Sequence, residues 1–206
     1  MKTLFYGLVV LIPLCFGFQL YTNVAVSDSE KRPYDVLMQD GEVELRYYPS
    51  VNMATFEQAG DMENRNGNFR VLAGYIFGGN EEERSIAMTS PVEMESKDDG
   101  NVRMSFMMPT DIDMDSLPTP NDERIQLHTT EAFYAATIRF DGFADSEKID
   151  THAAELRDWL KNEKLKPQGN MIFLGYDPPY KMTDRRNEVM FVLKEKEVRK
   201  HPKVEI

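Results

Sequence analysis

The segment NGNFRVLAGYIFGG, residues 66–79, carries the clearest structural signal in the chain. Its apolar side chains recur at the period of an α-helix and fall on one face: Phe69, Leu72, Ala73, Ile76 and Phe77. Asn66-Gly67-Asn68 provides start signals, and Gly78-Gly79 provides a left-handed stop. A helix with one apolar face packs on a sheet, so the sequence predicts a helix over residues 66–77 that lies against strands.

Residues 145–164, DSEKIDTHAAELRDWLKNEK, repeat this pattern further along the chain. Their apolar stripe consists of Ile149, Ala153, Leu156 and Leu160. Asp145 is placed to cap the first turn, and Pro167 is expected to end the helix after Lys166. This second helix is also one-sided, so it too is expected to lie on a sheet.

Short apolar or alternating runs predict the strands. They cover residues 43–47, 51–56, 86–94, 102–108, 125–129, 133–140, 171–176 and 189–193. Asp98-Asp99-Gly100-Asn101 is typical of a hairpin turn, which makes strands 86–94 and 102–108 antiparallel neighbours.

The order of these elements repeats. Each half of the chain has a strand, a helix and two further strands. In the first half these cover residues 51–56, 66–77, 86–94 and 102–108, and in the second half 133–140, 145–164, 171–176 and 189–193. The first strand of each unit ends in Phe followed by Gly, at Phe56 to Gly60 and at Phe140-Asp141-Gly142. The sequence therefore predicts an α+β fold. Its duplicated β-α-β-β units would form a distorted antiparallel eight-stranded barrel-like sheet with two flanking helices.

Composition limits the classes of function. The chain has 206 residues, 24 Lys and Arg, 35 Asp and Glu, and a formal net charge of −11. A chain of this length can bury a core without disulfides. Nucleic-acid binding relies on clustered basic side chains, and no basic stripe is present, so no nucleic-acid partner is expected.

The amino terminus is typical of an export signal. After Lys2, residues 4–20 carry no charge, and the small-residue stretch 24–27 follows. Residues 1–27 are interpreted as a cleaved signal peptide or, through residues 4–20, as an uncleaved membrane anchor. Residues 28–206 are then one exported domain, periplasmic or extracellular, that contacts a membrane only through an uncleaved anchor. Cys15 is the only cysteine, so that domain has no thiols.

Linear catalytic and metal-binding motifs are absent from the sequence. Residues 111–115 begin like a calcium loop, but Ser116 stands where that loop needs glycine. The three histidines, His128, His152 and His201, are far apart, and no C-x-x-C-H motif for covalent haem attachment occurs. The sequence therefore assigns no catalytic residue and no metal ligand.

Eight short motifs follow one another along the chain. They are Phe69-x-x-Leu72-Ala73-x-Tyr75-Ile76-Phe77-Gly78-x-Asn80, Ile86-Ala87-Met88-Thr89-x-Pro91-Val92, Phe106-x-Met108-Pro109, Leu117-Pro118-x-Pro120, Phe140-x-Gly142-Phe143, Leu156-Arg157-x-x-Leu160, Gly175-Tyr176-Asp177-Pro178-Pro179 and Arg185-Arg186-Asn187-Glu188-Val189. In this order they resemble the SOUL haem-binding protein family, from Tyr34 to Lys194.

The resemblance implies a duplicated β-α-β-β fold that binds haem or another tetrapyrrole non-covalently, without an enzymatic reaction. It places the ligand in an apolar groove beside the first helix and the loop after Asp-Pro-Pro. In this sequence the matching positions are Phe69, Leu72, Ala73, Ile76, Tyr180, Lys181, Arg185 and Arg186. The three cations would meet the haem propionates. Some members use a histidine near the second strand as axial ligand, but residues 46–50 contain none, so the axial ligand stays open.

We therefore expect an exported, non-catalytic carrier or scavenger of haem. The alternative is a binding module for another amphipathic or cationic small molecule, similar to bacterial effector-binding domains, in which a buried acid such as Glu188 would meet the ligand's charge. A third reading is an enzyme that modifies a tetrapyrrole, for which the sequence shows no nucleophile or acid-base pair. The sequence does not set the oligomeric state.

Overall fold

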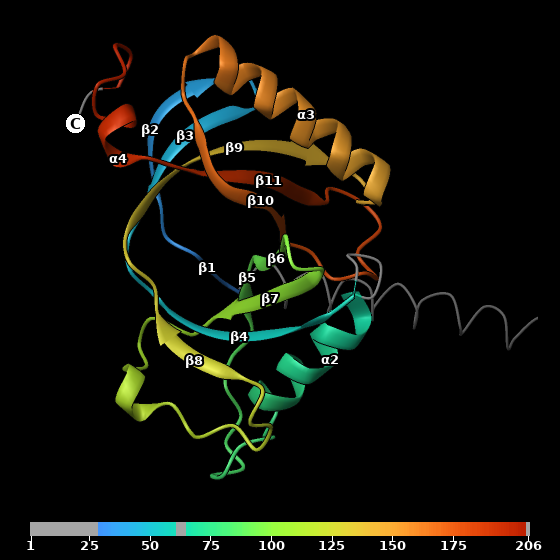
Figure 1. Cartoon of the computed structure of the whole chain (residues 1–206). Helices are drawn as coiled ribbons and strands as arrows, with labels where there is room; N and C mark the ends of the chain where they lie inside the picture. The colour runs from blue at the N-terminus through green and yellow to red at the C-terminus, as the bar shows by residue number, and fades with distance from the viewer. Residues whose placement is uncertain (1–28, 61–64, 205–206) are drawn as a thin grey trace, which may run out of the picture.

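The computed structural model describes residues 29–60 and 65–204 (Figure 1). The predicted signal or anchor, residues 1–27, lies outside the described residues. Nine strands form the main sheet: β2 (Asp35–Asp40), β3 (Val43–Tyr48), β4 (Asn52–Ala59), β6 (Val92–Ser96), β7 (Asn101–Met107), β8 (Gln126–Thr129), β9 (Phe133–Asp141), β10 (Pro167–Gly175) and β11 (Arg186–Leu193). A separate parallel pair joins β1 (Glu30–Lys31) to β5 (Thr89–Ser90). The helices are α2 (Arg65–Ile76), α3 (Ser146–Asn162) and the short α4 (Glu195–Val198), with a 3-10 turn at Met114–Ser116.

The α+β class is confirmed, but the expected barrel-like closure of eight strands is wrong. The sheet has nine strands in the order β2-β3-β9-β11-β10-β6-β7-β4-β8, and β2 and β8 lie at its two unpaired edges in the described part of the chain. The additional strand, β2, was not predicted because its apolar residues Val36 to Met38 are flanked by Asp35 and by Gln39-Asp40. Such a polar segment gives little strand signal, yet it forms an edge strand by pairing with β3.

The predicted duplication is confirmed in the strand order. The first unit, β4-α2-β6-β7, arranges its strands as β6-β7-β4, and the second, β9-α3-β10-β11, arranges its strands as β10-β11-β9. The units meet where β10 pairs antiparallel with β6. The strand that precedes each unit pairs with the other unit, because β3 pairs with β9 and β8 pairs with β4. The two halves are therefore interlocked by an exchange of their leading strands.

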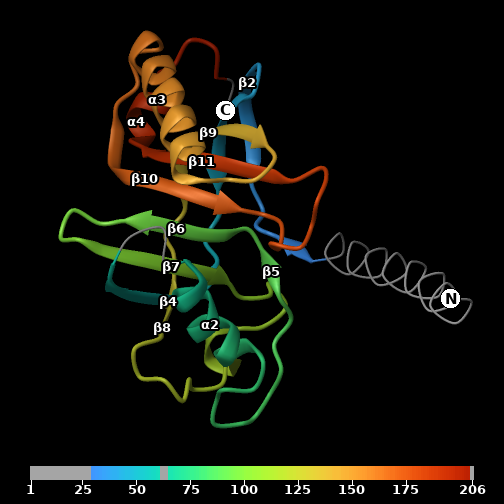
Figure 2. The same cartoon turned by 90° about the vertical axis from the view of Figure 1, so that its right-hand side faces the viewer.

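Both long helices pack on one face of the sheet. α2 lies on β4 and β7, and α3 lies on β9, β10 and β11. Figure 2 shows α3 above and α2 below, with β10 and β6 between them. The apolar side chains under the helices form the main core, in which Leu72, Ile76 and Leu156 are buried.

The boundaries of the elements follow local chemistry. Asp145 caps α3 as predicted, since its side chain accepts a hydrogen bond from the Lys148 backbone nitrogen at 2.9 Å. The helix ends at Asn162 and not at Lys166, because Lys164 adopts a left-handed conformation with φ of 60°. The predicted hairpin at residues 98–101 is confirmed, with Gly100 at φ 82° and with β6 antiparallel to β7. The strand expected over 86–94 is divided at Pro91, which lies between β5 and β6 and has no N–H for a ladder bond.

Candidate functional site

The helix residues of the expected groove have different positions on α2. Leu72 and Ile76 are in the core, with 0% and 1% of their surface exposed, and Ala73 is buried at the edge of that core. Phe69 is 38% exposed, and its ring packs at 5.4 Å from the ring of Phe106. Of the four predicted helix residues, only Phe69 offers substantial surface to a ligand.

The loop between β10 and β11 holds the predicted cations in internal bonds. The Lys181 Nζ donates to the Asp177 carboxylate and to the Asp184 carbonyl, both at 2.7 Å. Arg185 is buried, donates to the carbonyls of Pro178 and Lys181 at 2.6 and 2.9 Å, and stacks on Phe143. Tyr180 is 48% exposed. The loop therefore uses the charges of Lys181 and Arg185 to fix its own conformation.

Arg186 belongs to a buried cluster on the opposite face of the sheet from α2 and α3. This Glu188 cluster consists of Glu188, Arg46, Arg186, Tyr34, Tyr48 and Tyr176. The Glu188 carboxylate, which is 0% exposed, accepts two hydrogen bonds from Arg46 at 2.6 and 3.0 Å. It also accepts from Arg186 at 2.6 Å and from the Tyr176 hydroxyl at 3.1 Å. Arg46 and Arg186 therefore already neutralise Glu188, the acid that was expected to bind a cationic ligand in the alternative function.

Burial and pairing act in opposite directions on the ionisation of this cluster. Burial alone would raise the pKa of Glu188, but the hydrogen bonds and charges of Arg46 and Arg186 hold that pKa below its ordinary value. Burial raises the pKa of Tyr48 and of Tyr176, so both hydroxyls keep their protons. The cluster thus holds an ionised glutamate between two arginines at neutral pH.

This depressed pKa predicts a loss of stability on acidification. The ordinary pKa of a glutamate is 4.5. As the pH falls below this value, Glu188 becomes protonated in the unfolded chain but stays ionised in the folded protein. The contribution of Glu188 to the free energy of unfolding is therefore complete above pH 4.5. It decreases as the pH falls from 4.5 to below the lowered pKa of Glu188 in the folded protein. Thermal unfolding followed from neutral to acid pH should show this decrease, and the Glu188→Gln variant should show a shallower one. Equal acid slopes in the two proteins would contradict the prediction.

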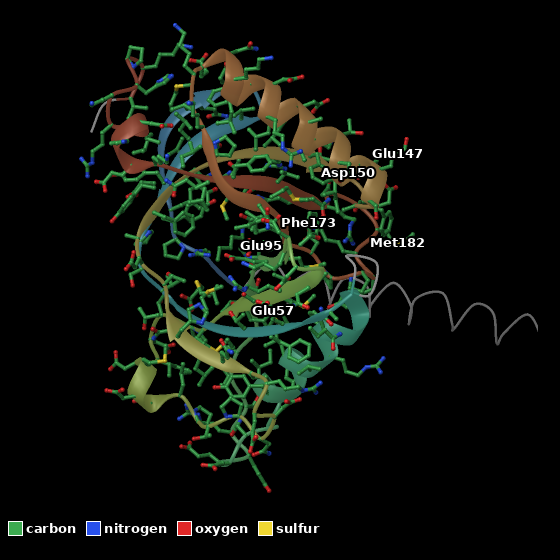
Figure 3. The ribbon with its side chains drawn as sticks, viewed as in Figure 1. Glu57, Glu95, Glu147, Asp150, Phe173 and Met182 are labelled. Carbon is green, nitrogen blue, oxygen red and sulfur yellow. The ribbon has the colours of Figure 1, made fainter. Side chains whose placement is uncertain are left out.

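A second group of residues lies on the helix-bearing face, between α2 and α3. We call it the inter-helix face and define it by Phe69, Val92, Met94, Phe173 and Arg157. Met94 and Phe173 face each other across the β6–β10 pair and are buried there in the main core, and the partly buried Val92 lies beside them on β6. Figure 3 shows Phe173 on the sheet below α3, with Met182 in the loop at the same side of the molecule as the beginning of α3. The inter-helix face therefore combines buried apolar side chains of the sheet with the exposed ring of Phe69.

Arg157 supplies the cation of this face. The Trp159 indole donates to Asp40 of β2 at 2.9 Å, so that flank of α3 faces the β2 edge. Residues two positions apart on a helix point about 200° apart, which directs Arg157 away from the β2 edge, to the β10 side of α3. Its guanidinium lies 4.8 Å from the centre of the Phe191 ring, and no ion pair involves it within residues 29–60 and 65–204. The sequence contained Arg157 in a family motif but gave no signal that its charge is unpaired.

The described histidines do not gather at this face. His152 lies seven positions before Trp159, on the flank that faces the β2 edge, where its ring stacks on Phe140. His128 is exposed on the edge strand β8, and His201 is buried against Glu163. No group of three or more His, Cys, Asp or Glu in the described part of the chain could hold a metal ion. Within the same residues, no helix is long and apolar enough to cross a membrane.

The fold places the chain in a class of proteins with two β-α-β-β units in one sheet. The C-terminal domain of EcmrR has this fold, with a TM-score of 0.59 and 13% identity over 78% of this chain and 98% of that one. A hydrolase from Listeria innocua has a TM-score of 0.53 and 12% identity over 81% of this chain and 94% of that one. At these identities the likeness concerns the fold alone.

Within this class the chain belongs to the SOUL heme-binding protein family, whose model matches residues 29–192. Heme-binding protein 1 of Xenopus laevis is 31% identical over 158 residues, which cover 72% of this chain and 82% of that protein. Heme-binding protein 2 of Mus musculus is 27% identical over 175 residues, which cover 81% of this chain and 85% of that protein. The family resemblance expected from the sequence motifs is thereby confirmed.

Proposed function

We propose that this protein is an exported, non-catalytic carrier or scavenger of haem or a related tetrapyrrole, and that the ligand binds on the inter-helix face. Two observations carry the proposal: the Phe69 ring is 38% exposed on α2, and Arg157, on the flank of α3 that faces away from the β2 edge, has no ion-pair partner among the described residues. Family membership and the names of the relatives give the ligand class.

The residues of this face fit the chemistry of a tetrapyrrole. Haem presents a flat apolar macrocycle with two carboxylates at one edge. The Phe69 ring and the exposed part of the partly buried Val92 side chain offer apolar surface to such a macrocycle, and the Arg157 guanidinium can pair with a carboxylate. Because His152 lies on the other flank of α3, no described histidine is placed to ligate the iron from this face. The non-covalent character of binding thus rests on apolar contact and charge.

The cations expected from the resemblance all have partners within the chain: Lys181, Arg185 and Arg186. Their contact with a ligand remains a prediction. Their release would have to break bonds to Asp177, to loop carbonyls and to Glu188. Arg157 needs no such release. We therefore propose that Arg157 binds one of the two carboxylates of the haem. Glu188, which already binds two arginines, offers no support for the cationic-ligand alternative.

A haemin titration followed in the Soret band tests the proposal. The wild-type chain should give a saturable one-to-one shift. Phe69→Asp and Arg157→Glu should each weaken binding at least about tenfold, since a charge-assisted hydrogen bond is worth roughly 1.5–3 kcal/mol. Lys200→Glu makes the same charge change at an exposed position beyond α4 and should bind like wild type.

Two outcomes would contradict this proposal. If wild type shows no saturable shift, haem is not the ligand. If Arg157→Glu and Lys200→Glu bind equally well, the ligand does not use the inter-helix face. Export rests on Lys2 and the uncharged residues 4–20, and cell fractionation that finds the chain only in the cytoplasm would remove that part.

A further inference from the structure

The face of the sheet opposite α2 and α3 carries three arginines that each combine a carboxylate with aromatic rings. Arg46 binds Glu188 and lies 4.0 Å from the centre of the Tyr34 ring. Arg186 binds Glu188 and lies 4.0 Å from the centre of the Tyr176 ring. Arg32 binds Glu93 and lies over Tyr48 and Phe133. Carboxylates beside aromatic faces form sites for organic cations, and here the chain's own guanidinium groups fill them.

Arg46 and Arg186 are each held on this face by several hydrogen bonds. Both belong to strands of the main sheet, β3 and β11. Arg46 donates to Glu44, Tyr48 and Glu188, and Arg186 donates to Tyr34 and Glu188. Displacing either guanidinium would break several hydrogen bonds, and the backbone that carries it is fixed in the main sheet.

Arg32 differs from both in its bonding. Its side chain is 3% exposed and pairs with Glu93 through Nη1, but Nε and Nη2 are buried without a hydrogen-bond partner in the described structure. Unpaired buried N–H groups oppose the docking of this side chain. Arg32 therefore occupies its site without satisfying all of its donors.

The segment that carries Arg32 also lies outside the main sheet. Its strand, β1, pairs with β5 over two residues only. The Arg32 backbone nitrogen donates to the Ser90 carbonyl at 2.8 Å, and the Glu30 carboxylate accepts from the Thr110 nitrogen and hydroxyl at 3.1 and 2.6 Å. The backbone of Glu30 to Arg32 is thus bonded to β5, outside the nine-stranded sheet, so its release leaves that sheet intact.

We propose that Glu93, Tyr48 and Phe133 form a second ligand site, selective for a planar organic cation of the guanidinium or amidinium class, and that Arg32 is its displaceable occupant. The Tyr48 and Phe133 rings stack at 5.0 Å with 17° between their planes, which gives an extended aromatic surface. Arg32 lies 5.3 and 5.1 Å from their centres, at the distance of a cation–π contact. The site lies on the other face from the proposed haem contacts and goes beyond that function.

Benzamidine, a planar amidinium, is the probe for this site, used with the full chain in calorimetric titration. Arg32→Ala vacates the site and should bind benzamidine saturably, at least about tenfold more tightly than wild type, because no occupant has to leave. Adding Glu93→Gln to Arg32→Ala should remove this gain. Arg103→Ala, which removes an arginine from the surface ion pairs with Glu57 and Glu95, is the matched control and should bind like wild type.

Glu30→Ala provides a second variant that leaves the site residues unchanged. It removes the bonds to Thr110 and loosens residues 29–32, so benzamidine should bind about fivefold more tightly than to wild type. If folded Arg32→Ala shows no saturable binding, or if Glu93→Gln does not weaken it, the proposal is wrong. If Arg32→Ala does not fold, Glu30→Ala decides: affinity equal to wild type overturns the proposal, and tighter binding supports it.

Discussion

Replacing Glu188 with alanine is expected to lower the free energy of unfolding by about 3–5 kcal/mol, because a buried ion pair that loses one partner leaves an uncompensated charge. The Arg46 side chain is 2% exposed and cannot turn to water. Arg186 is 22% exposed and can recover part of its hydration. Urea unfolding of wild type and variant, followed by circular dichroism, measures the loss.

Two companion variants separate the buried charge from other effects of this substitution. Glu195→Ala breaks the exposed pair with Arg199 and should leave the unfolding midpoint almost unchanged. Combining Arg46→Met with Glu188→Leu replaces one buried pair by apolar side chains and should recover the part of the stability lost in Glu188→Ala that comes from the unpaired charge of Arg46, while Arg186 stays without its carboxylate. A double variant less stable than Glu188→Ala would show that the pair stabilises the fold through more than mutual charge compensation.

Leu72→Ala and Phe69→Ala, three residues apart on one helix, should have opposite effects. Leu72 is fully buried under α2, so its truncation should lower the free energy of unfolding by about 2–5 kcal/mol. Phe69 is 38% exposed, so its truncation should cost much less stability but should weaken haemin binding. Urea unfolding and Soret titration of the same preparations give both quantities.

The comparison also tests where the ligand lies. Folded Leu72→Ala should bind haemin with nearly wild-type affinity, because Leu72 contributes to the core and not to the surface. Weak binding by Leu72→Ala together with normal binding by Phe69→Ala would place the ligand between α2 and the sheet. That result would contradict the assignment of the inter-helix face.

These two residues also show what the sequence can and cannot predict. A period of 3.6 residues identified the helix and placed Leu72 and Ile76 correctly at the centre of its sheet-facing side, but its extension to Phe77 is wrong, because α2 ends at Ile76 and Phe77 is 65% exposed. The same period cannot distinguish the centre of an apolar stripe from its flank. Phe69 lies on the flank, and only the position of the neighbouring strands shows that a flank is open to a ligand.

The cations of the candidate site were harder to predict than the fold. Lys181, Arg185 and Arg186 are close in sequence, which suggested a patch that meets carboxylates of a ligand. In the structure Lys181 binds Asp177, Arg185 binds backbone carbonyls of the same loop, and Arg186 binds Glu188. A hydrogen bond to a backbone carbonyl cannot be predicted from residue types, because every residue carries this acceptor. Arg157 is a single arginine on a polar helix flank, so its lack of an ion-pair partner in the described residues became visible only in three dimensions.

The exchange of leading strands determines when the chain can complete its structure during synthesis. β3 pairs with β9, so Val43 finds its partner Ile138 only after most of the first half and the start of the second have been made. Until then the amino-terminal half has a strand with one bare edge, and long-range pairing of this kind slows folding. Neither half is expected to be stable as a separate fragment, and the two should unfold together in a single transition.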